Sequence, residues 1–271
     1  MTPRLRVSLL VAAAAVAAAG TAVGVTLATR SEVTSGRTTA PPFAADPTAA
    51  AAVTSDVRAA LKTWPSGTVR RLRILAAQHP VSALVRLELG LALAFSGARA
   101  DSAAAWRAAK RVQPDSPSAV RADDLLHPGT PPGKPPFVPS FARPANRVQQ
   151  LLAEGIGFQQ ALRPMSAERA FEAAAAIAPD DPEAQVAAAV GAYDKDHPER
   201  AFGRLGPLTR RFPDAQTVRF HLGLLLIYLG EVPQARRELR LAVAEGRRTQ
   251  LAKRARLLLN ASRGNQNRRN K

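Results

Sequence analysis

The residues best suited to chemistry are concentrated in one short run, DKDHPE, which starts at Asp194. Four of its side chains are of types that ligate hard or borderline metal ions: Asp194, Asp196, His197 and Glu199. The run also has the form of a turn before a helix, with Asp196 or His197 as the cap and Pro198 at the first helical position. We favour the turn and predict no metal site.

The remaining polar residues do not form a catalytic constellation. Three of the four histidines precede proline, which is typical of helix ends, and the fourth, His221, is expected at the edge of a core or groove. The chain has no cysteine, which excludes disulfides, thiolate zinc sites and cysteine nucleophiles. It also has no phosphate-binding loop, GxGxxG, GxSxG or HExxH motif. We therefore expect neither an enzyme nor a resident cofactor.

A 34-residue period organises most of the chain, with clear blocks starting at Val148, Pro182 and Gln216. The eighth and twentieth places hold small residues, and the twenty-fourth holds a large apolar one. These are Gly155, Ala189 and Gly223, then Ala167, Ala201 and Ala235, then Phe171, Leu205 and Leu239. Another block starts at Ala83, and a weaker one at Ala49. The pattern predicts two closely packed helices in each block, with the large residue filling the space beside the small ones.

These residues resemble the tetratricopeptide repeat family, whose unit is a 34-residue helix–turn–helix. The resemblance covers residues 49–126 and 148–249, with C-terminal repeats at 148–181, 182–215 and 216–249. It implies an all-α fold, a helix–turn–helix solenoid, which we expect to be closed by a capping helix at 250–262. Three positions depart from the family pattern: Thr68, Ser102 and Ala192.

Two segments interrupt or flank this array. Residues 127–147 form a proline-rich linker with seven prolines between His127 and Pro144, a composition that favours extended polyproline conformation. Residues 31–48 are polar and rich in threonine and proline, and we expect a flexible linker there. The chain closes with a basic tail at 263–271.

Residues 1–30 contain an uncharged stretch, Val7–Thr29, long enough to span a bilayer as a transmembrane helix. The stretch has two readings, an uncleaved anchor or a cleaved secretory signal. We favour the anchor and expect a single-pass protein of the bacterial envelope, with its repeats outside the cytoplasm; cleavage would make it a secreted protein. Gly20 and Gly24 form a GxxxG pattern through which two such helices could self-associate.

The family resemblance implies a concave groove, lined by the first helix of each repeat, that takes a segment of a partner protein. Eight side chains are expected to line it: Leu152, Ile156, Val186, Val190, Tyr193, Phe220, Leu224 and Ile227. Such an apolar groove suits an amphipathic helix or an extended hydrophobic segment. The alternative is that neighbouring helices or the chain's own proline-rich segment cover these side chains.

The net charge of +17 supports a second functional hypothesis. Acidic and basic residues nearly balance within 148–245, whereas nine of the last 26 residues are basic and none is acidic. This tail could bind a polyanion such as anionic lipid or a cell-wall polymer. It has no aromatic residue on which bases could stack, so nucleic acid is not expected. The primary prediction is a non-enzymatic, membrane-anchored scaffold that binds a protein partner in the groove.

Overall fold

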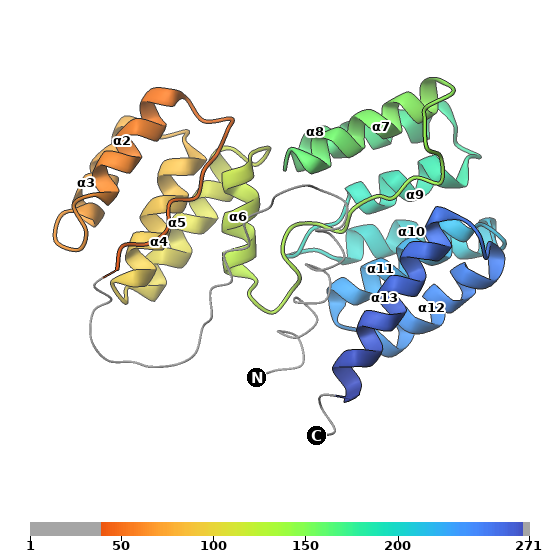
Figure 1. Cartoon of the computed structure of the whole chain (residues 1–271). Coiled ribbons are helices and arrows are strands. Elements are labelled where there is room, and N and C mark those ends of the chain that lie inside the picture. Colours follow the sequence, from red (N-terminus) through yellow and green to blue (C-terminus); the bar gives the residue numbers. More distant parts are fainter. Residues whose placement is uncertain (1–38, 268–271) are drawn as a thin grey trace. The chain divides into compact units, whose positions relative to one another are not determined.

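The computed structural model of the chain describes residues 39–267 (Figure 1). The predicted anchor or signal within residues 1–30, its Gly20 and Gly24 pair, the first part of the predicted linker and the last four residues of the tail lie outside the described residues. The described residues form helices joined by turns and extended segments and contain no β-strand. The all-α prediction is confirmed for this part of the chain.

None of the described helices is both long enough and apolar enough to cross a bilayer.

The described chain divides into two compact units, residues 39–126 and residues 127–267, which we call the N-terminal unit and the C-terminal unit. The helices of the N-terminal unit are α2 (Ala51–Leu61), α3 (Thr68–Gln78), α4 (Ala83–Phe95), α5 (Arg99–Val112) and α6 (Pro117–Leu126). Those of the C-terminal unit are α7 (Arg147–Gln160), α8 (Pro164–Ile177), α9 (Pro182–Gly191), α10 (Glu199–Arg211), α11 (Gln216–Leu229), α12 (Val232–Glu245) and α13 (Gln250–Asn267).

Within each unit, helix–turn–helix hairpins stack on one another. Each helix packs against the next one in the chain. The first helices of successive hairpins also touch: α2, α4 and α6 form one such row, and α7, α9, α11 and α13 form the other. Helices α7, α9 and α11 begin within one residue of the 34-residue frame, so the period places these helices where the structure has them.

The hairpins close through the contact that the eighth and twenty-fourth places predict. A Cβ added to Gly155 would lie 2.3 Å from the ring of Phe171, which is far inside van der Waals contact. The equivalent distance is 2.8 Å between Gly223 and Leu239. A side chain at Gly155 or Gly223 would therefore prevent the two helices of its hairpin from approaching so closely.

Local signals set where several helices begin. Asn146 caps α7 by accepting a 2.9 Å hydrogen bond from the backbone of Gln149, and Asp181 caps α9, which starts with Pro182 as predicted. The turn before α10 differs from the prediction. Helix α10 starts at Glu199, and the N-cap position before it is occupied by Pro198, without a side-chain cap.

At the C-terminal end, α13 starts where the capping helix was predicted and continues to Asn267, beyond the predicted boundary at residue 262. Its buried side chains include Leu251, Ala255 and Leu258, which join the core of the C-terminal unit. The N-terminal unit has buried clusters of its own, around Leu72 and Leu87. Each unit therefore has its own apolar interior.

Candidate peptide-binding groove

The eight side chains predicted to bind a partner all lie on the first helices α7, α9 and α11 or immediately after α9, and we call the face they line the C-terminal groove. Seven of them are buried and Ile156 is half-buried. They belong to, or pack against, one apolar cluster that also contains Phe137 and Val138 of the proline-rich linker. The groove is therefore filled in this structure.

The segment that fills it is residues 134–141, sequence KPPFVPSF, which we call the C-terminal strap. It is part of the extended segment that leads into α7 (Figure 1). Phe137 is 2% exposed, and its ring lies 5.4 Å from that of Phe171, centroid to centroid. The strap thus contributes side chains to the core of the unit.

Hydrogen bonds hold the backbone of the strap to all three helices of the groove. The N–H of Phe137 donates to Oε1 of Gln159 on α7 at 3.0 Å. The N–H of Val138 donates to Nε2 of His221 on α11 at 2.9 Å. The hydroxyl of Tyr228, also on α11, donates to the carbonyl of Lys134 at 3.1 Å. Backbone hydrogen bonds of this kind are typical of the way grooves hold extended peptides.

Ser140 provides the contact with α9. Its hydroxyl donates to Oε2 of Glu183 at 2.9 Å, and its backbone N–H donates to the other carboxylate oxygen. Burial raises the pKa of Glu183 above its usual range, an effect that these two hydrogen bonds partly offset. The two hydrogen bonds from Ser140 give the carboxylate of Glu183 the polar partners that its apolar surroundings lack.

His221 is the polar centre of the groove and is completely buried. Its Nδ1 lies 2.7 Å from the backbone carbonyl of Thr217, which can only accept, so Nδ1 carries the proton and Nε2 accepts from Val138. Desolvation lowers the pKa of His221 to about 4, so the ring is neutral at physiological pH. The ring of Phe137 stacks on it, with centroids 5.1 Å apart.

The N-terminal unit holds a segment of its own in a comparable way. Residues 41–48, sequence PPFAADPT, lie against α4 and α6. We call these residues the N-terminal strap, and we call the face of α4 and α6 that they contact the N-terminal groove. The N–H of Ala44 donates to Oε1 of Glu88 on α4 at 2.7 Å. The guanidinium of Arg121 on α6 donates to the carbonyl of Ala45. Residues expected to belong to a flexible linker are therefore bound to the unit that follows them.

Asp46 anchors the end of this strap on α6. Its carboxylate accepts from the N–H of Ser118 at 3.1 Å and from the hydroxyl of the same residue at 2.5 Å. Burial alone would raise the pKa of Asp46, but hydrogen bonds from Ser118 and Thr48 lower it below its usual value. The carboxylate is held in its charged form.

Glu88 is fully buried, and one of its carboxylate oxygens, Oε2, has no hydrogen-bond partner. Desolvation raises the pKa of Glu88 to about 8, although the hydrogen bond from Ala44 and the nearby charge of Arg121 act in the opposite direction. Burying an acidic side chain destabilises the fold unless its polar atoms form hydrogen bonds. The N–H of Ala44 in the N-terminal strap provides one such hydrogen bond to Glu88.

The two straps share sequence and register. Each contains Pro-Pro-Phe, and in each the residue after the phenylalanine donates its N–H to a buried side chain. The acceptors, Glu88 and His221, both stand at the sixth place of the 34-residue frame. Sequence reasoning missed both roles. The available signals were the repeated Pro-Pro-Phe and the two titratable residues at a place where the other blocks have Thr54, Ala153 and Ala187.

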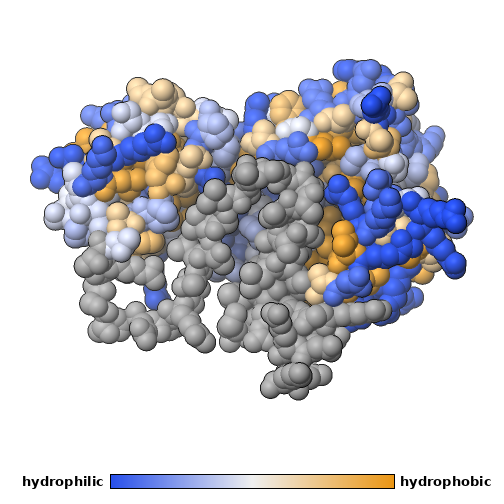
Figure 2. Space-filling model, in the orientation of Figure 1, coloured by the Kyte–Doolittle hydropathy of each residue, from blue (hydrophilic) through white to orange (hydrophobic). Residues whose placement is uncertain are grey.

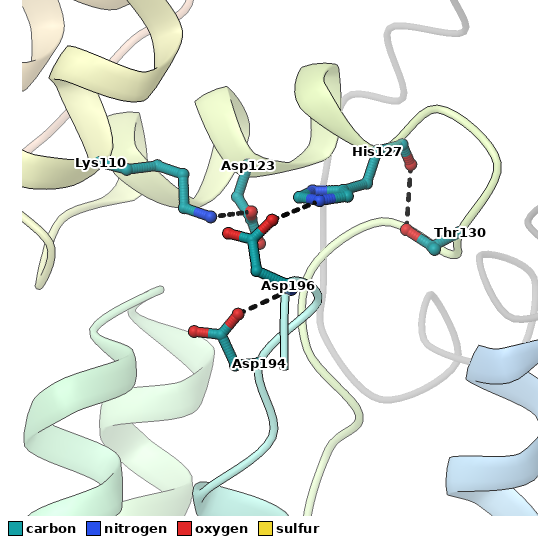
Figure 3. Close-up of polar contacts among 6 residues, drawn as sticks. All are labelled: Lys110, Asp123, His127, Thr130, Asp194 and Asp196. Atoms are coloured by element: carbon teal, nitrogen blue, oxygen red, sulfur yellow. Dashed lines mark hydrogen bonds and ion pairs between the residues drawn. The ribbon is translucent and has the colours of Figure 1, made fainter. Parts of the chain in front are cut away.

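The turn cluster around Asp194 serves structural contacts (Figure 3). Within the C-terminal unit, Oδ1 of Asp196 accepts from Nε2 of His127 at 2.9 Å, and the N–H of Asp196 donates to Asp194 at 2.8 Å. The hydroxyl of Thr130 donates to the carbonyl of His127. His197 pairs with Glu199 at 3.1 Å on the surface. The turn is therefore stabilised by hydrogen bonds among its own residues and by the contact of Asp196 with His127.

Within the N-terminal unit, Figure 3 also shows Nζ of Lys110, on α5, 2.5 Å from Oδ1 of Asp123 on α6. Both side chains are largely buried, so the pair fixes α6 against α5.

Comparison with known proteins adds little. No family model and no curated protein matches the chain. Among solved structures, a chain described as "MamA RS-1 ArsTM double mutant" is similar at 15% identity, over 72% of this chain and 93% of that one. The TM-score is 0.26, which is too low to indicate a shared fold.

Proposed function

We propose that this chain is a non-enzymatic protein-interaction scaffold of the tetratricopeptide type, and that its C-terminal groove binds an extended segment of a partner protein. The observation that carries the proposal is the strap itself. The groove holds residues 134–141 by hydrogen bonds from their backbone to Gln159 and His221 and by the packing of Phe137 in the apolar cluster. A surface that binds one extended peptide in this way is suited to bind another.

In this proposal the strap and the partner compete for one site. Because the strap is covalently attached, it acts at an effective concentration of roughly millimolar, so a partner must bind well or be presented at high local concentration. The groove is then closed in the absence of partner, which protects its apolar side chains from unspecific contacts.

The titratable groups of the groove support a binding role over a catalytic one. His221 is buried and accepts from Val138, while Glu183 accepts from Ser140. Both groups accept hydrogen bonds from the strap, as expected for a groove whose polar atoms bind the backbone of an extended peptide.

The location of the scaffold is part of the same proposal. Val7–Thr29 would anchor the chain in a membrane, with the repeats outside the cytoplasm, or would be removed as a secretory signal. With an anchor, the ten residues 31–40 would keep the N-terminal strap within about 35 Å of the bilayer. A partner in or near the same membrane would then reach the grooves at high local concentration.

A second function, binding to anionic lipid or a cell-wall polymer, is favoured by the surface around α13. Exposed basic side chains follow one another there without an acidic residue: Arg247, Arg248, Lys253, Arg254 and Arg256. Hydrophilic surface gathers over the end of the C-terminal unit where α12 meets α13 (Figure 2). Leu257, which is 62% exposed, could add an apolar contact with a lipid surface. Vesicle binding that falls steeply with salt would support this second function.

The primary proposal is tested by site-specific photo-crosslinking in native membranes. A photoreactive residue replaces Ile156, which is half-buried in the groove, or Leu241, an exposed residue of α12 that serves as the control position. Each is placed in the otherwise native full-length chain and in a variant whose strap is loosened by Phe137→Ser.

We expect the loosened variant to form an intermolecular product from position 156 but not from position 241. The chain with the intact strap should crosslink from position 156 mainly to its own residues 134–141. If the loosened variant remains folded, as judged by its thermal unfolding, and yields the same products as the intact strap at both positions, the groove is not the partner site.

A further inference from the structure

We infer that both grooves recognise one class of ligand, an extended segment of the form Pro-Pro-Phe-x-x-Ser or Pro-Pro-Phe-x-x-Asp, and that the partner presents such a segment to the C-terminal groove in competition with the strap. The inference rests on the proposed function and adds the chemistry of the ligand. It starts from the fact that two separate units bind the same tripeptide in the same register.

The two prolines suit a groove whose polar groups are few. Proline has a fixed φ and no N–H, so a Pro-Pro pair loses little conformational entropy on binding and brings no donor that must be satisfied. The first proline of each pair, Pro41 or Pro135, is buried. A ligand with other residues here would bury N–H groups for which partners would have to be found.

The phenylalanine supplies the apolar anchor. Phe137 packs against the rings of both Phe171 and His221 in the C-terminal unit. Phe43 packs on the apolar cluster of the N-terminal unit, with the guanidinium of Arg58 4.7 Å from its ring centroid. The ring is therefore used in both grooves, although its neighbours differ.

The amide after the phenylalanine is the polar feature that both grooves read. It is donated to Glu88 in one unit and to His221 in the other, and both acceptors are fully buried. These acceptors have different chemistry but the same place in the repeat. The shared requirement is thus an N–H at this point of the ligand, which excludes proline there.

The position three residues after the phenylalanine distinguishes the two grooves. In the C-terminal groove it is Ser140, which donates to Glu183. In the N-terminal groove it is Asp46, which accepts from Ser118. In the C-terminal groove the strap provides the hydroxyl and the helix provides the carboxylate, whereas in the N-terminal groove the strap provides the carboxylate and the helix provides the hydroxyl. The C-terminal groove should therefore prefer serine at this position and reject an acidic residue, whose charge would face Glu183.

Peptide binding by the full-length protein in detergent micelles tests the inference. Residues 134–141 are replaced by a Gly-Ser sequence of equal length, and binding of a fluorescent peptide KPPFVPSF is followed by anisotropy at pH 7.5. We expect this variant to bind the peptide at least about tenfold more tightly than the native chain, whose own strap competes. The Phe137→Ala variant, which keeps the rest of the strap, serves as a milder second background.

Matched peptides test each feature of the ligand. N-methylation of the valine amide removes the donor to His221, and KPPFVPDF places an acid opposite Glu183; each should weaken binding about tenfold or more. A scrambled peptide of the same composition should not bind. Equal binding of these peptides, or no binding of KPPFVPSF by either variant while it remains folded, would overturn the inference.

Two further outcomes are separable. If differently tagged native and strap-replaced chains co-purify through the strap, the occupant is a second copy of this chain, and the assignment to a partner is wrong. If crosslinking from position 156 succeeds but the peptides fail, the interaction groove stands and only the ligand class is refuted. If the peptides bind but crosslinking fails, the groove is selective and the scaffold function is refuted.

Discussion

The backbone nitrogen of Val138 lies 2.9 Å from Nε2 of His221, and this hydrogen bond joins positions 83 residues apart in the chain. It ties a proline-rich segment with no helical period to the centre of α11. The proton on Nδ1, which is donated to the carbonyl of Thr217, leaves Nε2 free to accept. The C-terminal strap is thereby part of the apolar interior of the C-terminal unit.

Removing the acceptor should loosen the strap. His221→Phe keeps an aromatic ring for Phe137 to stack on but leaves the N–H of Val138 buried without a partner. We expect a loss of about 1–3 kcal/mol in the free energy of unfolding of the C-terminal unit, measured by chemical denaturation. Arg248→Ala, on the exposed turn after α12, is the control and should change it by less than about 0.5 kcal/mol. A His221→Phe variant as stable as the native chain would show that the bond is not formed.

Acid should release the C-terminal strap. The pKa of His221 is about 4 in the folded unit and 6.5 when exposed, so the unfolded chain binds the proton first. The stability that the folded unit gains from keeping His221 neutral and buried is complete above pH 6.5 and is lost as the pH falls from 6.5 to 4. The fluorescence of a probe attached to the strap, titrated from pH 7 to 4, should report its departure in the native chain. The His221→Phe variant should lack this component, and an identical titration in both would contradict the assignment.

The N-terminal unit should respond to pH in the opposite sense. The pKa of Glu88 is about 8 in the folded unit and 4.5 when exposed, so the folded unit keeps a proton that the unfolded chain has released. Stability is greatest below pH 4.5 with respect to this group and declines as the pH rises to 8. Glu88→Gln keeps a carbonyl acceptor for Ala44 and should remove the decline. Denaturation of the native chain and this variant at pH 5, 6.5 and 8 measures the difference, and parallel curves would contradict the prediction.

The hairpin contact predicts opposite effects for two glycines of one helix. Gly155→Ala places a methyl group 2.3 Å from the Phe171 ring and should destabilise the unit by about 1–3 kcal/mol. Gly157 is in the same helix, and an added Cβ there meets no atom within 4 Å. Gly157→Ala should therefore stabilise the unit by about 0.5–1 kcal/mol. Thermal unfolding of both variants checks the pair, and equal shifts would show that Gly155 makes no close approach.

The repeat could be predicted from the sequence because its constraints recur. Small residues such as Gly155 and large ones such as Phe171 return every 34 positions, and each pair has the same mechanical role. The helix start at Pro182 follows from its local signal in the same way. The start of α10 did not follow in this way, because Asp196 and His197 were both candidate caps, whereas the structure has Pro198 at the N-cap position.

The straps could not be predicted in this way. An extended segment has no period of its own, and the prolines that mark residues 127–147 as extended do not say what the segment contacts. The eight groove side chains lie on or just after the first helices α7, α9 and α11, but the pattern of the repeats did not predict that Phe137 and Val138, from outside the repeats, would share their apolar cluster. His221 accepts a hydrogen bond from Val138, which lies 83 residues away in the sequence, and no local pattern around either residue indicates this contact.

Amide hydrogen exchange of residues 134–141 in the full-length protein tests the central claim most directly. Prolines carry no N–H, so few amides contribute, and those of Phe137, Val138 and Ser140 donate within the groove. We predict that the Val138 amide exchanges as slowly as the buried backbone of α11 around His221. Exchange of Val138 at the rate of an unstructured peptide would contradict the claim that the groove holds this segment.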